Sequence, residues 1–263
     1  MQIDIFQIDA FTDKVFGGNP AAVCPLDGWP SDEILQKIAL ENNLSETAFF
    51  VKRQNHYELR WFTPTTEVDL CGHATLATAW VLRNAFDDVA FPVRFSTKSG
   101  ELSVDADGDE LMLDFPLHAP VPCAPPEGLL PALGVKRAEV LSAGEEYLVI
   151  LEDEAGVKGL EPDLSGLTKL PALAVIVSAP GDTVDFVSRC FAPNVGIDED
   201  PVTGAAHTIL TPYWARRLGK EVLEARQVSR RGGKLRCRIA GDRVLLSGRA
   251  VKYMEGRLTL PAE

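Results

Sequence analysis

The chain has 263 residues, of which 46% are hydrophobic and 24% are charged, and its formal net charge is −12. This composition is typical of a globular protein with one large domain or two smaller ones. The acidic balance argues against a nucleic-acid partner, whose recognition depends on basic surface, and against adhesion to anionic membranes.

Several other classes of protein lack support. No apolar run is long enough to span a bilayer, and Met1–Asp4 lack the basic start of a signal peptide, so we expect a cytoplasmic protein. No glycine-rich phosphate loop follows a predicted strand, which argues against a nucleotide site. We expect neither a disulfide framework nor a zinc site, because the cysteines are odd in number and widely spaced: Cys24, Cys71, Cys123, Cys190 and Cys237.

In the first half of the chain, apolar patterns predict a strand-rich region with two helices. The first helix begins after Ser31, a good N-cap, and ends near Asn42–Asn43. The second contains Leu76, Ala77 and Trp80 at helical spacing. Strands are expected at residues 3–11, 21–24, 44–51 and 57–61, followed by a three-strand meander at residues 93–95, 102–104 and 111–115.

The second half begins with a proline-rich segment, residues 118–131, that we interpret as a linker. Residues 183–189 are expected to form a short helix or turn, and residues 191–218 a loop followed by a helix. Because short strands outnumber helices, the pattern favours an α+β protein over a βαβ series. Further strands are expected at residues 139–142, 147–151, 173–178, 228, 235–239 and 244–246.

The junction between the predicted strand at residues 57–61 and the second helix carries the densest chemistry. Cys71, His73 and Thr75 place a thiol, an imidazole and a hydroxyl where the helix starts. A helix start has unpaired backbone N–H groups and a positive dipole end, so it can hold a carboxylate or phosphate. The junction therefore suits proton chemistry on a small anion.

A short internal repeat links the two halves. Phe191-Ala192-Pro193 resembles Phe62-Thr63-Pro64, and each is followed by an acidic loop and a small-residue helix start. Pro201 suits the first position of the helix expected within residues 191–218. Chance similarity is the alternative for so short a match. A real repeat would imply two similar domains whose helix starts point into one interdomain cleft.

Glu46 and His73 are the main candidates for acid–base chemistry. Glu46 lies at the edge of an apolar strand, where desolvation would raise its pKa toward that of a general base. An exposed loop glutamate or a cap is the alternative, and the local sequence alone favours it. His73 has a free pKa near neutrality, and its alternative role is to cap or pack the helix start.

Two other residues and two segments have both a functional and a structural interpretation. Cys71 lies where thiol pKa values fall, but a small buried residue is the favoured interpretation. Asp200 could face a cleft or serve as an N-cap. The segments Gly17–Pro20 and Arg230–Lys234 could contact a substrate carboxylate, although turn formation explains both.

Taken together, these motifs resemble the phenazine-biosynthesis PhzF-like isomerase family. They run in order through most of the chain and are specific for family and fold more than for one reaction. The matching segments are Asp9–Thr12, Gly18–Val23, Ser45–Phe49, Phe62–Pro64, Glu67–Thr75, Phe191–Pro193 and Glu199–Ala206.

The resemblance implies a diaminopimelate-epimerase-like fold with two pseudo-symmetric α+β domains, each a sheet wrapped around a central helix. We expect domains at residues 1–118 and 119–263, and central helices that begin near Gly72 and Val202. An alternative is that the last strand crosses back to the first domain. The resemblance also implies a cofactor-independent enzyme without a metal, a small carboxylate-bearing substrate and a homodimer. In the family's best-known reaction, a glutamate moves a proton within trans-2,3-dihydro-3-hydroxyanthranilate.

The family's catalytic glutamate falls on Glu46, its assisting histidine on His73 and its assisting aspartate on Asp200. The related epimerases use two facing cysteines, whereas here Cys71 would be matched by Pro201. An epimerase that uses Cys71 or Glu46 is one alternative, and a binding protein without catalysis is another. The expected substrate-binding residues are Asn19, Gly72, Ala74, Thr75, Thr203 and Gly204.

Overall fold

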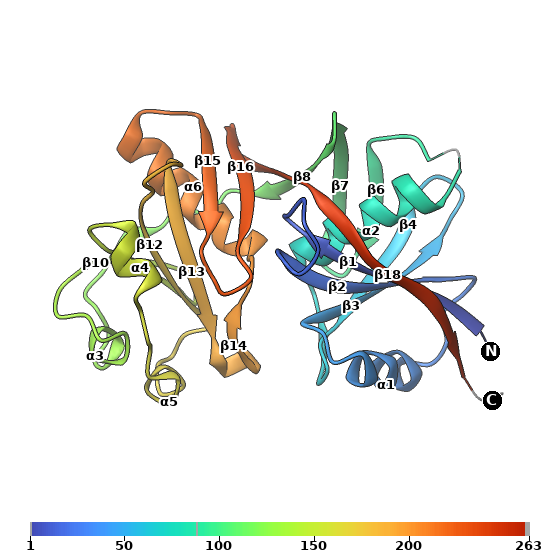
Figure 1. The fold of residues 1–263 in the computed structure, drawn as a ribbon, viewed down its shortest axis with the longest axis horizontal. Coiled ribbons are helices and arrows are strands. Elements are labelled where there is room, and N and C mark those ends of the chain that lie inside the picture. The colour runs from blue at the N-terminus through green and yellow to red at the C-terminus, as the bar shows by residue number, and fades with distance from the viewer. Residues whose placement is uncertain (1, 88, 261–263) are drawn as a thin grey trace. The chain divides into compact units, whose positions relative to one another are not determined.

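A computed structural model describes residues 2–87 and 89–260. The chain divides into two compact units, Met1–Asp114 with Ser247–Glu263, and Phe115–Leu246 (Figure 1). The structure is mostly β-sheet with few long helices, and the predicted α+β class is confirmed. Within the described residues, no helix combines the length and apolar character needed to cross a membrane.

In the first unit a mixed sheet is built by successive pairings. Strand β18 pairs antiparallel with β1, β1 antiparallel with β2, β2 parallel with β3, β3 antiparallel with β4, and β4 parallel with β6. The predicted meander β6–β7–β8 and the short hairpin partner β5 complete it. Their bounds are β1 Gln2–Ala10, β2 Asn19–Leu26, β3 Glu46–Lys52, β4 Tyr57–Phe62, β5 Glu67–Val68, β6 Val93–Thr97, β7 Gly100–Asp107, β8 Glu110–Pro116 and β18 Ala250–Thr259.

Two helices cover opposite faces of this sheet. Helix α1 (Asp32–Asn42) has Ser31 as N-cap and Asn43 in the left-handed region at its end, as predicted. It packs on Phe49 and Phe62. Side chains alternate along a strand, so Glu46, three residues before Phe49, lies on the other face. That face holds α2 (Gly72–Ala85), which starts at the predicted Gly72.

The second unit repeats the pairing pattern. Strands β10, β11, β12, β13, β15 and β16 pair in the order antiparallel, parallel, antiparallel, parallel, antiparallel, as β1, β2, β3, β4, β6 and β7 do. The predicted repeat is therefore confirmed. The bounds are β9 Val121–Pro122, β10 Glu139–Ala143, β11 Glu146–Ile150, β12 Ala174–Pro180, β13 Phe186–Ala192, β14 Ile197–Asp200, β15 Val222–Gln227, β16 Gly233–Ala240 and β17 Arg243–Gly248.

Helices again cover both faces of the sheet. Helix α6 (Gly204–Leu218) packs on Phe186, which stacks on Trp214 at a centroid distance of 5.8 Å. The other face carries a cluster that includes Val187 and Phe191. The short helices on that cluster are α3 Leu129–Ala132, α4 Glu154–Lys158 and α5 Leu164–Leu167, and the turn η1 spans Pro193–Val195.

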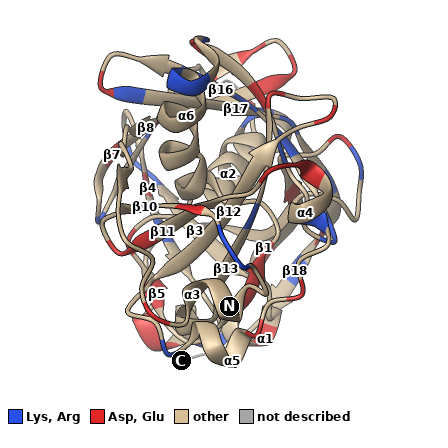
Figure 2. Ribbon diagram, turned by 90° about the vertical axis from the view of Figure 1, so that its left-hand side faces the viewer, with Lys and Arg blue, Asp and Glu red and all other residues tan. Residues whose placement is uncertain are grey.

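The two central helices have the composition of buried elements. Neither carries Asp, Glu or Lys, and arginine occurs only in the last turn, as Arg83 of α2 and as Arg216 and Arg217 of α6. Figure 2 shows both helices in tan over most of their length. Helix α6 contains Pro212, yet it continues to Leu218. An uncharged helix can be surrounded by apolar strands on several sides without burying unpaired charges.

Each repeat contains an arginine that pairs with a glutamate across a hairpin. Arg60 of β4 binds Glu67 of β5 through two N–H···O contacts of 2.7 and 2.8 Å, and its guanidinium lies over Phe62. Arg189 of β13 binds Glu199 of β14 at 2.7 and 3.0 Å and lies over Phe191. Bidentate, partly buried pairs of this kind fix the hairpin that leads to each central helix.

Three sequence-based predictions need correction, and one strand was missed. The proline-rich segment is not a plain linker, because it contains β9 and α3 and packs in the second unit. Residues 183–189, expected to form a short helix or turn, include the first four residues of strand β13 (Phe186–Ala192). Strand β18 was not predicted, because most of its side chains are exposed. Helix α6 begins at Gly204, not near Val202, so Pro201 is not its first residue and Asp200, in β14, is not its N-cap.

Candidate active site

Glu46 is the first residue of β3 and is paired in register with Ala21 of β2. Its side chain is buried, with 8% exposed, although the local sequence favoured an exposed loop position. The strand places the carboxylate on the face that holds α2, next to the first turn of that helix. Burial and sheet pairing therefore position Glu46 far more tightly than its sequence neighbours indicate.

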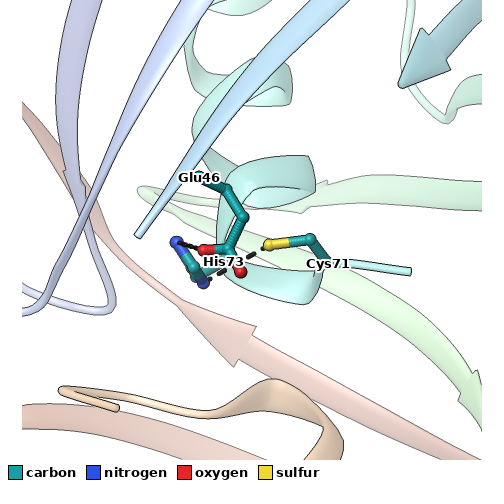
Figure 3. Close-up of side chains that lie close together, drawn as sticks. All are labelled: Glu46, Cys71 and His73. Carbon is teal, nitrogen blue, oxygen red and sulfur yellow. Dashed lines mark hydrogen bonds and ion pairs between the residues drawn. The ribbon is translucent and has the colours of Figure 1, made fainter. Parts of the chain in front are cut away.

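Cys71 and His73 come from the start of α2. Cys71 is the N-cap and His73 the second helical residue, and both are buried. Oε2 of Glu46 lies 3.2 Å from Nε2 of His73, and Sγ of Cys71 lies 3.5 Å from Nδ1 of the same ring. Figure 3 shows the three side chains pointing toward one another, with dashed lines that join one ring nitrogen of His73 to the carboxylate and the other to the thiol sulfur.

The proton on His73 is held by its neighbours. Burial lowers the pKa of the imidazole, but Cys71 and Glu46 raise that pKa, and the net result lies well above the ordinary value. Burial and the charge of Glu46 raise the pKa of Cys71 to about 11, so its sulfur is a thiol at neutral pH. The carboxylate of Glu46 is therefore the group that favours the imidazolium form of His73.

The contact between Glu46 and His73 is close but not a well-formed hydrogen bond. Oε2 of Glu46 and Nε2 of His73 are buried and make no hydrogen bond to another described residue. Buried polar atoms are normally hydrogen-bonded, and exceptions are often found at functional sites. Both atoms thus keep the capacity to bind a ligand.

Glu46, Cys71 and His73 also have the donor types of a zinc site, and one potential ligand atom from each lies within 4.8 Å of the others. The imidazole, however, presents Nε2 to Glu46 and Nδ1 to Cys71, so each neighbour contacts a different ring nitrogen. One ion can bind only one of these nitrogens, so coordination would require the other contact to open. The arrangement fits a chain of proton-bearing groups better than a chelate.

Asn19 adds a fourth polar group to this part of the site. It is the first residue of β2, its side chain is wholly buried, and its Nδ2 lies 3.1 Å from Nδ1 of His73. Of the expected binding residues near α2, Thr75 uses its N–H and its hydroxyl on the carbonyl oxygen of Cys71, at 3.1 and 2.6 Å. Substrate binding by Asn19, Gly72, Ala74 and Thr75 stays a prediction.

Asp200 and Thr203 lie together in the second unit. Oγ1 of Thr203, the N-cap of α6, donates to Oδ2 of Asp200 at 2.5 Å. Gln227 of β15 completes the group: its Oε1 accepts from the Thr203 N–H, and its Nε2 donates to the Asp200 carbonyl oxygen. Substrate contacts of Asp200, Thr203 and Gly204 remain predictions.

The helix starts correct the expected match of Cys71 with Pro201. Cys71 is the N-cap of α2 and Thr203 the N-cap of α6, and Gly72 and Gly204 follow them. Glu67 and Glu199, the arginine-bound residues, precede these N-caps by the same number of residues. Thr203 is therefore the counterpart of Cys71, and the position still lacks a second thiol.

Sequence reasoning missed Gln227 and the two arginines. Gln227 carries no local signal, because its partners are distant in the chain. The arginines do have a local signal, since Arg60-Trp-Phe-Thr-Pro and Arg189-Cys-Phe-Ala-Pro align over five positions. The internal repeat therefore begins two residues before Phe62 and Phe191, at Arg60 and Arg189.

Comparison with known proteins agrees with this architecture. The model of the PhzC-PhzF family, described as phenazine biosynthesis-like protein, matches residues 8–256. The chain belongs to this family. An uncharacterized isomerase of Pseudomonas aeruginosa is 58% identical over 260 residues, which cover 99% of this chain and 100% of the relative.

Solved structures give the same result. A PhzF family protein of Enterococcus faecalis is 46% identical, with a TM-score of 0.95 and coverage of 99% of this chain and 100% of the other. A predicted epimerase of Pseudomonas aeruginosa, 19% identical with a TM-score of 0.75, covers 98% and 100% and shares the fold. The predictions of a PhzF-like isomerase and of a diaminopimelate-epimerase-like fold are confirmed.

Proposed function

We propose that this PhzF-like protein is a cofactor-independent isomerase that moves a proton between two carbon atoms of a small carboxylic acid. The observation that carries the proposal is the buried pair of Glu46 and His73, 3.2 Å apart, whose facing atoms make no hydrogen bond to other described residues. A buried carboxylate next to an imidazole is a suitable general base and acid.

In the proposed reaction, Glu46 accepts a proton from one carbon and the electron pair of the broken C–H bond shifts into an adjacent conjugated system. The same carboxyl group then returns the proton to another carbon, so product and substrate have the same atoms. The imidazolium of His73 stabilises the negative charge that develops while the proton is on Glu46. No redox partner is required.

The starts of α2 and α6 support a carboxylate-bearing substrate. Neither helix has an acidic residue in its first turn or a side-chain cap of its first N–H groups. Such helix starts favour anions. We propose that each helix start binds an anion separately, through the backbone of Gly72 and Ala74 in the first unit and of Gly204 in the second. Thr75 and Thr203, whose own donors bind Cys71, Gln227 and Asp200, would shape these two positions. An assisting role for Asp200 and a homodimeric assembly rest on the family resemblance, and both are tested below.

An epimerase that uses Cys71 as a base is less well supported. The thiol pKa of about 11 leaves little thiolate at neutral pH. Thr203, at the equivalent N-cap, has no thiol to serve as a second base.

The proposal is tested with a panel of small cyclic and amino carboxylic acids, including trans-2,3-dihydro-3-hydroxyanthranilate. Each compound is incubated in deuterium oxide with the wild type and with Glu46→Gln. We expect isomerisation or exchange of at least one compound by the wild type, and its loss in the variant. Glu154→Gln is the matched control, because Glu154 is a buried glutamate that pairs with Lys158 in the second unit.

Turnover that persists in Glu46→Gln would contradict the assignment of Glu46. Binding without turnover of any compound by the wild type would favour the binding-protein alternative. Asp200→Asn in the same assay tests the assisting aspartate, and sedimentation analysis tests the homodimer.

A further inference from the structure

Asn19 stands out among the residues near the site because its amide is wholly buried and contacts a catalytic side chain. Its Nδ2 lies 3.1 Å from Nδ1 of His73, 54 positions away in the sequence. Burying an amide costs free energy unless it is hydrogen-bonded. The contact with His73 offsets part of that cost and joins β2 to α2.

The backbone before Asn19 leaves this side chain little freedom. Gly18 has a φ of +62°, and a Cβ at this position would lie 2.1 Å from the carbonyl oxygen of Ala10. Asn19 itself pairs with Ala10 across β1 and β2. The preceding loop is also tied down, because Oδ2 of the buried Asp9 accepts from the Phe16 N–H at 2.8 Å.

The direction of the hydrogen bond determines the state of the imidazole. An amide nitrogen can only donate, so Nδ1 of His73 accepts and the ring proton of the neutral imidazole lies on Nε2, toward Glu46. When the ring is an imidazolium, the same amide, rotated by 180°, presents its oxygen to Nδ1. The other group at Nδ1, the Cys71 thiol at 3.5 Å, is a weak partner.

We propose that Asn19 is a positioning residue that keeps His73 oriented with Nε2 toward Glu46 and selects the tautomer with the proton on Nε2. Asn19 thus acts through His73, not on the substrate as the sequence suggested. The relevance to turnover rests on the proposed function, whereas the effect on His73 does not.

Nitrogen-15 NMR of protein labelled at histidine tests the proposal, because the chemical shifts of Nδ1 and Nε2 report the tautomer. His73 is assigned by the signals that disappear in His73→Gln. At alkaline pH, where the ring is neutral, we expect the proton on Nε2 in the wild type. In Asn19→Asp, which has the same shape but only accepts, we expect it on Nδ1. Asn42→Asp is the control, since Asn42 bonds Thr47 instead.

The proposal would be overturned if the neutral His73 ring of the wild type carried its proton on Nδ1. It would also be overturned if Asn19→Asp left the His73 tautomer unchanged. Asn19→Ser provides a second variant if Asn19→Asp does not fold. If the wild type isomerises one of the tested compounds, both variants should lower kcat for that compound roughly 10- to 100-fold and change KM little. A loss of this size is typical when a group that orients a histidine of a site is removed. A rise in KM alone would indicate a substrate-binding residue. Loss of turnover in Glu46→Gln tests the proposed function separately.

Discussion

Nε2 of His73 lies 3.2 Å from Oε2 of Glu46, although the two residues come from a helix start and a strand start 27 positions apart. A different element positions each residue: the N-terminal turn of α2 positions His73, and the pairing of β3 with β2 positions Glu46. The pair is thus assembled before a ligand arrives. Preorganised charge of this kind needs little reorganisation when the reaction begins.

The raised pKa of His73 predicts a loss of stability at alkaline pH. Since its folded pKa lies above its unfolded value, His73 contributes stability that is complete below the unfolded pKa and disappears as the pH rises through the folded pKa. Urea unfolding of the wild type and His73→Gln at several pH values measures this. The gap between their free energies of unfolding should shrink at high pH, and a gap that widens there would contradict the account.

His207 predicts the opposite pH dependence. Burial lowers its folded pKa to about 4, and its Nδ1 donates to the Thr203 carbonyl oxygen. The unfolded state then binds protons more tightly, so stability falls as the pH drops from the unfolded pKa through about 4. The full loss is about 3 kcal/mol, at roughly 1.4 kcal/mol per pKa unit. His207→Gln should lose less stability than the wild type between neutral and acid pH in urea unfolding, and an equal loss would exclude His207 as its source.

Cys71 should be dispensable for turnover. Because its thiol is protonated at neutral pH, we expect Cys71→Ser to retain most of kcat and the wild-type thiol to react slowly with iodoacetamide. A loss of about 100-fold or more in Cys71→Ser would instead identify the thiol as an acid–base group. Cys71→Ala separates a packing effect from the loss of a polar group.

Gly18→Ala should destabilise the protein more than Gly108→Ala. The two glycines have φ values of +62° and +59°, but a Cβ at Gly18 would collide with the Ala10 carbonyl and one at Gly108 meets nothing within 4 Å. Each substitution costs about 1–2 kcal/mol for the left-handed backbone, and Gly18→Ala a further 1–3 kcal/mol, roughly, for the collision. Chemical denaturation compares the two, and equal losses would show that the contact with Ala10 does not constrain Gly18.

The sequence predicted those parts of the fold that local patterns determine. Helix α1 has a cap at Ser31 and a left-handed end at Asn43, and both ends lay where expected. Strand β18 has no such pattern, because the side chains from Tyr253 to Arg257 are exposed and its register is set by pairing with β1. Partners so distant in the chain leave no local signal.

In the candidate site, too, single residues could be selected from the sequence, whereas their contacts could not. The resemblance selected Glu46 and His73, but only the folded chain brings them together with Asn19. The start of α6 was misplaced because Pro201 suits a first helical turn. In the structure the chain at Asp200 still pairs with Cys190 of β13, and Gln227 binds the N–H of Thr203. Tertiary contacts therefore delay the helix by two residues beyond Val202.

The most direct test of the central claim, one carboxylate that carries the proton, is the fate of that proton. A compound that the protein isomerises is labelled with deuterium at the carbon that loses its hydrogen, and single-turnover product formed in ordinary water is analysed by mass spectrometry. We predict that part of the deuterium is found at the new carbon, because a buried Glu46 returns the same proton before it exchanges. Complete loss of deuterium to solvent in every turnover would contradict a single shuttling carboxylate.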